Sequence, residues 1–183
     1  APGSKLSVAL LAYPEAQIWA IEKDSLRYRS TLKRLMDNPA TCKELHRLQF
    51  INADALDWMT GFENESMDFI LLDAPCSALG TVLNHPEFLT LKKNQRVDHL
   101  SELQLKLINN ALPLLKSGGQ LIYSVCTFRL EECDMIMKRC SQEHKNIQFI
   151  HDDSILGEKI FQCDYGQYVW GDRDKANQLF YFQ

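Results

Sequence analysis

Apolar and polar positions along the chain follow patterns that predict helices and strands in turn. Helices show apolar residues at intervals of three and four, whereas buried strands show short continuous apolar runs. In the first third of the chain these patterns predict a helix over 4–12, a strand over 17–22, a helix from Asp24 or Ser25 to Asp37, and a strand over 48–52. Asn38-Pro39 ends the longer helix, because proline lacks the N–H that a helix interior requires.

The rest of the chain continues the alternation. The run M-D-F-I-L-L-D over 67–73 predicts a strand buried on both faces, as in a parallel sheet. We further predict an amphipathic helix over 99–115 that ends at Ser117-Gly118-Gly119, a buried strand over 120–125, a helix over 131–144, and an antiparallel pair of 147–150 with 179–182. Helices alternating with buried strands indicate an α/β fold, with a mostly parallel sheet and helices on both faces.

Composition fits a protein of this class. The 183 residues are 45% hydrophobic and 24% charged, which is typical of a globular domain with its own core. The net charge of −4 argues against binding nucleic acid by bulk positive charge, so any RNA contact would be local. Lys92, Lys93 and Arg96 form the best local basic patch, although a solvated loop explains them equally well.

Cysteine usage indicates a reducing compartment. The 6 cysteines form neither a C-x-x-C pair nor a zinc-finger spacing, so we expect free thiols, no metal and a cytoplasmic location. The sequence holds no apolar stretch of the roughly 18 residues that a membrane span needs, and we expect no membrane association. No pattern suggests an oligomer.

Acidic residues end three of the predicted strands: Glu22, Asp54 and Asp73. Strand ends in an open α/β sheet line one crevice, and a glycine turn at a helix start admits a ligand close to the backbone. Gly3 supplies such a turn before the first helix. One glycine is usually only a turn, and one strand-end carboxylate is as often merely solvated. Together they suit a ligand with hydroxyls, an amine and a positive charge, as S-adenosylmethionine has.

Two cysteines follow buried strands in the same way. Cys76 lies in Asp73-Ala74-Pro75-Cys76-Ser77, and Cys126 lies in Tyr123-Ser124-Val125-Cys126-Thr127. A single buried cysteine is most often a small hydrophobic residue. Neighbouring strands lie about 4.8 Å apart, so both thiols would reach one reacting group if the two strands are adjacent.

These segments resemble motifs of the RNA 5-methylcytosine methyltransferases. D-A-P-C-S is similar to motif IV, Y-S-V-C-T to motif VI, and A-P-G-S-K to the end of motif I. The stretch 73–134 resembles the bacterial small-subunit ribosomal RNA enzyme of the Sun/Fmu type, with His85-Pro86-Glu87 and Leu103-Gln104 in matching places. The resemblance covers the chain to about residue 140.

The resemblance implies a role for each matching residue. Cys126 would be the nucleophile that adds to carbon 6 of cytosine, and Cys76 would help to resolve the covalent adduct. Asp73 would hydrogen-bond the base, and Lys5 would orient the base or Asp73. The residues implied around S-adenosylmethionine are Ala1, Pro2, Gly3, Ser4, Lys5, Glu22, Asp54 and Asp73. The substrate would be RNA, and by analogy ribosomal RNA.

The chain departs from the family pattern at two points. Ser4 stands where the family usually has glycine, which is acceptable if its φ is negative. The strand that should precede Ala1 is absent, and in this fold it lies between the strands that end at Glu22 and Asp73. We therefore expect residues 1–183 to be an N-terminally truncated methyltransferase catalytic domain.

Two other interpretations stay open at this point. DNA cytosine methyltransferases also carry a Pro-Cys motif, and there that cysteine is the nucleophile; Cys126 favours the RNA class instead. A non-catalytic paralogue or inactive fragment would bind RNA or cofactor without turnover. Both cysteines and all three strand-end carboxylates are present, which favours a catalyst.

Overall fold

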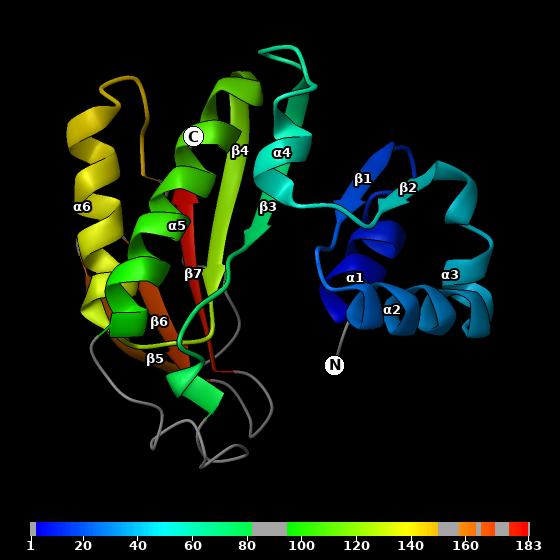
Figure 1. The fold of residues 1–183 in the computed structure, drawn as a ribbon, viewed down its shortest axis with the longest axis horizontal. Helices are drawn as coiled ribbons and strands as arrows, with labels where there is room; N and C mark the ends of the chain where they lie inside the picture. Colours follow the sequence, from blue (N-terminus) through cyan, green and yellow to red (C-terminus); the bar gives the residue numbers. More distant parts are fainter. Residues whose placement is uncertain (1–2, 82–94, 150–157, 164–165, 171–175, 183) are drawn as a thin grey trace. The chain divides into compact units, whose positions relative to one another are not determined.

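A computed structural model of the chain describes residues 3–81, 95–149, 158–163, 166–170 and 176–182; for 95–98 and beyond 157 it describes the backbone alone (Figure 1). The chain forms two compact units, Ala1–Gly61 and Phe62–Gln183. The basic patch expected at Lys92, Lys93 and Arg96 lies outside what is described, as do Ala1, Pro2 and the His85-Pro86-Glu87 turn. In the described part of the chain, no helix is long and apolar enough to cross a membrane.

The first unit contains two parallel strands and their helices. Its elements are α1 (Ser4–Ala12), β1 (Ile18–Ile21), α2 (Ser25–Asp37), α3 (Pro39–Cys42), the 3-10 turn η1 (Leu45–Arg47), β2 (Leu48–Ile51) and α4 (Ala55–Met59). β1 pairs with β2 in parallel, with Ile18 opposite Leu48 and Ile21 opposite Ile51. The helices and strands predicted over 4–12, 17–22 and 48–52 are confirmed within a residue or two at each end.

Capping explains where α2 begins and ends. The Asp24 side chain accepts a hydrogen bond from the Arg27 N–H at 2.8 Å, which satisfies a donor left free in the first turn. Asn38 ends α2 and also caps α3, whose first residue is Pro39. The prediction of a helix from Asp24 or Ser25 to Asp37 is confirmed.

Arg47 holds the end of α1 in place. Its side chain is only 6% exposed, and its guanidinium donates to the backbone oxygens of Leu10, Tyr13 and Ala16 at 2.8, 3.0 and 2.6 Å. It also pairs with the Glu44 carboxylate at 2.7 Å. A buried charge is costly unless it is paired and hydrogen-bonded, and here every contact serves that purpose.

The second unit is built on a five-stranded sheet with the order β3-β4-β7-β6-β5. The strands are β3 (Met67–Asp73), β4 (Leu115–Val125), β5 (Glu158–Cys163), β6 (Gly166–Trp170) and β7 (Ala176–Phe182). β3 and β4 are parallel, whereas β7, β6 and β5 join antiparallel. The helices are η2 (Leu79–Thr81), α5 (Gln95–Ala111), η4 (Leu112–Leu114), η5 (Leu130–Glu132) and α6 (Asp134–Glu143).

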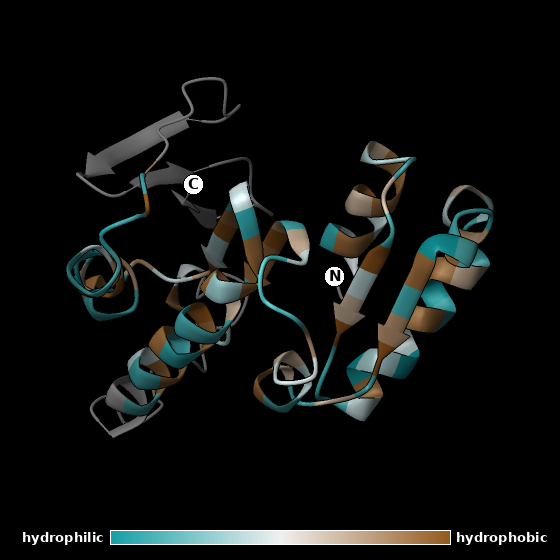
Figure 2. Ribbon diagram, turned by 90° about the horizontal axis from the view of Figure 1, so that it is seen from above, coloured by the Kyte–Doolittle hydropathy of each residue, from teal (hydrophilic) through white to brown (hydrophobic). Residues whose placement is uncertain are grey.

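The core of this unit lies between the sheet and two helices, α5 and α6 (Figure 1). Fully buried side chains come from each of these elements, namely Ile108 of α5, Leu121 and Tyr123 of β4, and Ile136 and Met137 of α6. Hydrophobic and hydrophilic residues follow one another along α5, as the amphipathic pattern predicts (Figure 2). Burying such side chains is the main term that holds the layers together.

The predicted helix over 99–115 is wrong at both ends. α5 runs over Gln95–Ala111, and a 3-10 turn containing Pro113 leads directly into β4. Proline removes a helical donor and clashes with the preceding turn, so the helix ends before it. Ser117-Gly118-Gly119 is therefore no helix cap. It forms an irregularity inside β4, where Gly118 has φ 79° and the pairing with β3 shifts register.

Two further expectations about strands are corrected. β3 is not buried on both faces, because Phe69 and Leu71 are each 39% exposed; β3 is an edge strand of its sheet. The strand over 179–182 is extended to Ala176–Phe182, and it pairs with β4 and β6 instead of with 147–150. Its pairing with β4 places an antiparallel strand beside the parallel pair.

Cys140 of α6 offers a test of the packing. Burial raises the pKa of its thiol to about 12, whereas a free thiol has a pKa of about 8.5. The unfolded chain therefore loses this proton first, so the stabilisation is complete below about pH 8.5 and is lost as the pH rises towards about 12. Urea unfolding at about pH 8 and at about pH 10 measures this loss in the free energy of unfolding. We expect the loss between the two pH values to be smaller for Cys140→Ala than for wild type, by up to about 1.4 kcal/mol per pH unit. Exposed Cys42 gives the control, because Cys42→Ala should follow wild type. Equal slopes for Cys140→Ala and wild type would contradict the assignment.

Candidate active site

The glycine turn of the first unit has the expected conformation. Gly3 directly precedes α1 with φ 80°, a region that favours glycine. A Cβ there would also lie 2.6 Å from Cγ2 of Thr31 on α2, so no side chain fits. Ser4 is the first residue of α1, and its helical conformation meets the condition under which serine replaces glycine. Lys5 lies in the first turn of the same helix.

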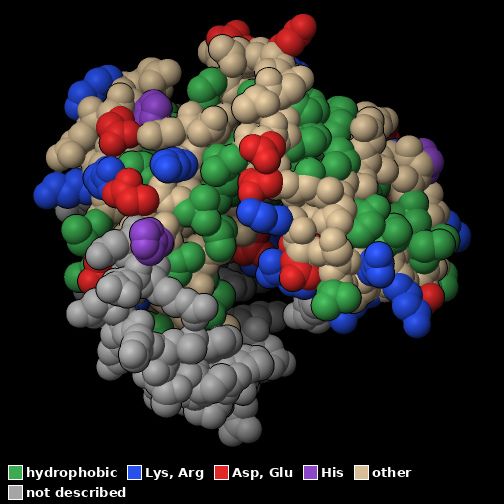
Figure 3. Space-filling view, in the orientation of Figure 1, with side chains coloured by type: hydrophobic (Ala, Val, Ile, Leu, Met, Phe, Trp, Pro, Cys, Tyr) green, Lys and Arg blue, Asp and Glu red, His purple; other side chains and the backbone are tan. Residues whose placement is uncertain are grey.

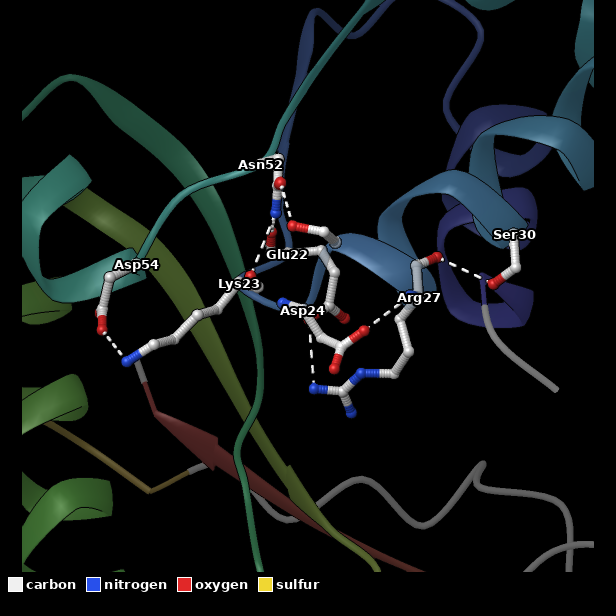
Figure 4. Close-up of polar contacts among 8 residues, drawn as sticks. Glu22, Lys23, Asp24, Arg27, Ser30, Asn52 and Asp54 are labelled. Carbon is white, nitrogen blue, oxygen red and sulfur yellow. Dashed lines mark hydrogen bonds and ion pairs between the residues drawn. The ribbon is translucent and has the colours of Figure 1, made fainter.

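Glu22 follows β1 directly and lies beside the end of β2 (Figure 4). Its N–H donates to the Ile51 oxygen at 3.0 Å, which continues the strand pairing. Its Oε1 accepts from the Asp24 N–H at 2.8 Å and lies 3.2 Å from the Arg27 guanidinium. Both contacts use Oε1, and Oε2 takes part in neither of them. The side chain is thus fixed at the strand end, as the sequence predicts.

Asp54 stands after β2 and caps α4 (Figure 4). Its Oδ1 accepts from the Leu56 N–H at 3.0 Å, and its Oδ2 lies 2.6 Å from the Lys23 ammonium. The hydrogen bond from Lys23 holds the pKa of Asp54 below its usual value, and the same bond raises the pKa of Lys23. The sequence predicted the strand-end carboxylate but not its ammonium partner.

In the second unit, β3 and β4 bring their ends to the same point. Asp73 lies opposite Ser124, and the Ala74 N–H donates to the Ser124 oxygen at 3.0 Å. The adjacency of the strands that lead to Cys76 and Cys126 is therefore confirmed. Asp73 itself is exposed at the end of β3.

The two predicted thiols are in contact. The Sγ atoms of Cys76 and Cys126 lie 3.2 Å apart, and the Cys126 N–H donates to the Cys76 sulfur at 3.3 Å. The hydrogen bond with Cys126 raises the pKa of Cys76 well above its usual range, and burial adds to the shift. Both effects favour the protonated form of Cys76.

A buried carboxyl group links the two cysteine loops, and the sequence analysis missed it. Glu132 is fully buried; its Oε1 accepts from the Ser77 N–H at 2.9 Å, and its Oε2 accepts from the Ser77 hydroxyl. Gln104, also fully buried, donates through Nε2 to Glu132 Oε1 at 3.1 Å and to the Pro75 oxygen at 2.8 Å. The signal in the sequence was a glutamate and a glutamine amid the apolar positions of two helical segments.

The structure thus gathers the predicted residues in two groups, one in each unit. Gly3, Ser4, Lys5, Glu22 and Asp54 belong to the first unit, while Asp73, Cys76 and Cys126 belong to the second. Cys133 and Cys140 are buried packing residues, and Cys42 is exposed. Among the described residues, no group of three or more His, Cys, Asp or Glu side chains is arranged to hold a metal ion.

On the face shown in Figure 3, acidic and basic side chains lie among one another. Exposed pairs such as Lys116 with Asp68 at 2.8 Å and Arg139 with Glu102 at 2.7 Å neutralise one another locally. The hydrogen bond with Arg139 lowers the pKa of Glu102. Exposed pairs of this kind contribute little stability.

Solved structures with the same fold include methyltransferases. NSun6 from Pyrococcus horikoshii, solved with SFG, aligns with the whole chain at a TM-score of 0.72 and 25% identity, and the chain covers 44% of it. A methyltransferase homolog protein from the same organism aligns with 90% of the chain at a TM-score of 0.58 and 20% identity, with 52% of its own length covered. The fold is that of the S-adenosylmethionine-dependent methyltransferases.

The sequence comparison is more specific. Residues 1–183 match the family described as 16S rRNA methyltransferase RsmB/F, and the chain belongs to that family. It is 35% identical over 136 residues to ribosomal RNA small subunit methyltransferase B of Shewanella oneidensis, with 72% of the chain aligned. The Vibrio cholerae protein of that name is 33% identical over 157 residues, or 84% of the chain. The chain spans about a third of these relatives, 29% and 34% of their lengths.

The contact between the two thiols predicts that they can be joined. Diamide should oxidise Cys76 and Cys126 to an intramolecular disulfide, with both thiol protons passing to the reduced diamide. The sulfurs need to approach from 3.2 Å to the bond length of about 2.05 Å. Peptide mass spectrometry should identify the linked pair in wild type and in Cys42→Ser, and should find none in Cys76→Ser. Linkage of Cys126 mainly to another cysteine would contradict the observed geometry.

Proposed function

We propose that this chain is the catalytic part of an enzyme that transfers a methyl group from S-adenosylmethionine to carbon 5 of a cytosine in ribosomal RNA. The observation that carries the proposal is the 3.2 Å contact between the thiols of Cys76 and Cys126, on loops that leave adjacent parallel strands. Membership of the 16S rRNA methyltransferase RsmB/F family supports ribosomal RNA as the substrate. The choice of cytosine carbon 5 rests on the pair of thiols.

The residues of the first unit suit the cofactor. Gly3 allows close approach at the start of α1, whose first N–H groups carry partial positive charge. Glu22 would accept hydrogen bonds from ribose hydroxyls through Oε2, since Oε1 is already engaged. NSun6, the related protein that was solved with the S-adenosylmethionine analogue SFG, supports the same ligand. S-adenosylmethionine would supply the methyl group as an electrophile.

Cys126 would act first, as the nucleophile. Carbon 5 of cytosine is a weak nucleophile until a thiolate adds to carbon 6, which makes carbon 5 electron-rich enough to accept the methyl group. A thiolate at Cys126 would be stabilised by the Cys76 thiol, which lies 3.2 Å away and can donate to it. Asp73 would hydrogen-bond the base edge.

Cys76 would act in the second half of the reaction. Methylated carbon 5 must lose its proton before the bond between carbon 6 and Cys126 breaks and returns the electron pair to the sulfur. In the covalent adduct Cys126 is a neutral thioether, so the hydrogen bond that chiefly raises the pKa of Cys76 is gone. Cys76 would therefore become easier to deprotonate at the step where a base is needed.

The cofactor assignment predicts an effect of Glu22→Ala. Loss of a charge-assisted hydrogen bond costs about 1.5–3 kcal/mol, so affinity for S-adenosylmethionine should fall roughly ten- to a hundredfold. Calorimetric titration of the full-length protein measures this, with circular dichroism to check folding. Glu15→Ala replaces an exposed acidic residue of the same unit and should bind as wild type. Unchanged affinity in Glu22→Ala would remove Glu22 from the cofactor site.

The cysteine roles predict opposite behaviour of two variants. Cys126→Ala should neither methylate RNA nor form a covalent complex, because no thiolate attacks carbon 6. Cys76→Ala should attack and methylate but release slowly, leaving enzyme linked to RNA. A denaturing gel of each full-length variant with labelled ribosomal RNA and S-adenosylmethionine separates the two, and Cys42→Ala serves as the matched cysteine control. A trapped band with Cys126→Ala and none with Cys76→Ala would instead make Cys76 the nucleophile, as in the DNA enzymes.

A further inference from the structure

A buried polar network connects the loop of Cys76 with the loop of Cys126. Glu132, at the end of η5, accepts two hydrogen bonds from Ser77 and one from Gln104. The Ser77 and Thr127 hydroxyl oxygens lie 2.9 Å apart, and Thr127 Oγ1 accepts from the Arg129 N–H at 3.3 Å. The hydroxyls therefore form a directed chain in which Thr127 donates to Ser77 and Ser77 donates to Glu132.

The network holds the residues that flank the two thiols. Cys76 lies between Pro75 and Ser77, and both neighbours are fixed, Pro75 through Gln104 and Ser77 through Glu132. Cys126 directly precedes Thr127, which the same chain holds. The Glu132 carboxyl group bonds to Ser77 and Gln104, so it acts on the thiols through the loops that carry them.

We propose that Glu132 is a positioning residue that clamps the two cysteine loops together and so sets the separation between the Cys76 and Cys126 thiols. The proposal rests on the cysteine mechanism above, and it adds a fully buried residue to it. Its backbone oxygen accepts from the buried Tyr123 hydroxyl at 2.8 Å, which anchors the clamp to β4. A clamp made of buried hydrogen bonds is stiff, because breaking one of them leaves a buried donor without a partner and out of reach of water.

The clamp requires reach and acceptor geometry rather than charge, and this distinguishes three variants. Glu132→Gln keeps the length of the side chain; its oxygen can accept from Ser77 N–H and Gln104, and its amide can donate to the Ser77 hydroxyl. Glu132→Asp keeps the carboxylate but is one methylene shorter, so it cannot reach all its partners. Ser77→Ala removes the hydroxyl that joins Glu132 to Thr127 and leaves the backbone contact intact.

Two readouts in the full-length protein test the clamp. The first is the rate at which diamide joins Cys76 to Cys126, which needs neither RNA nor cofactor. The second is the fraction of enzyme trapped on RNA, since a displaced Cys76 should slow release. We expect Ser77→Ala and Glu132→Asp to slow disulfide formation and adduct release about tenfold, the effect of losing one buried hydrogen bond. Glu132→Gln should stay within about threefold of wild type.

Glu131→Gln is the matched control, because the neighbouring carboxylate is half-exposed and pairs only loosely with Arg129 at 3.6 Å. It should behave as wild type in both assays. Wild-type rates in Ser77→Ala and Glu132→Asp would overturn the clamp, as would activity in Glu132→Asp combined with its loss in Glu132→Gln. If Glu132→Asp fails to fold, Ser77→Ala carries the test alone. If Cys76→Ala never traps RNA, the cysteine mechanism fails, whereas the disulfide rates still decide the clamp.

Discussion

The parallel pairing of β3 with β4 is the constraint on which the candidate site depends. It sets Asp73 opposite Ser124, so the chain leaves both strands at the same level of the sheet. The loops that follow therefore start side by side, since Ala74, the first residue beyond β3, is already bonded to β4. Strand register thus brings both cysteine loops to the same part of the sheet.

Strand register, however, fixes a loop only at the point where it leaves its strand. Residues beyond the last ladder bond need other partners, and here side chains supply them from inside the core. A polar group buried among apolar neighbours lowers the stability of the fold when it has no hydrogen-bond partner. When it has one, the hydrogen bond restricts the conformation of the segments that it joins. The polar network around Glu132 supplies such partners for both cysteine loops.

Much of this arrangement could be predicted from the sequence, because the relevant signals are local. Continuous apolar runs located β3 and β4, and the cysteines followed each run at a similar distance. The end of α5 was mispredicted because a glycine pair was taken for a helix cap, although Pro113 had already ended the helix. Phe69 and Leu71 are exposed because β3 lies at the edge of its sheet. The order of strands in a sheet cannot be read from the apolar residues of one strand. Glu132 escaped prediction because its partners are remote in sequence, 28 residues away at Gln104 and 55 at Ser77.

Arg47 shows how such remote dependence shapes the tolerance of the chain to mutation. Its planar fork spans three carbonyl oxygens and one carboxylate at the end of α1 opposite Gly3. A lysine presents its donors from a single point and cannot span them, so exchange of one basic residue for another is not conservative here. Exposed basic residues such as Lys116 or Arg139 face no comparable demand. Arg47 would therefore tolerate substitution less than any other basic residue of the first unit, although its role is structural.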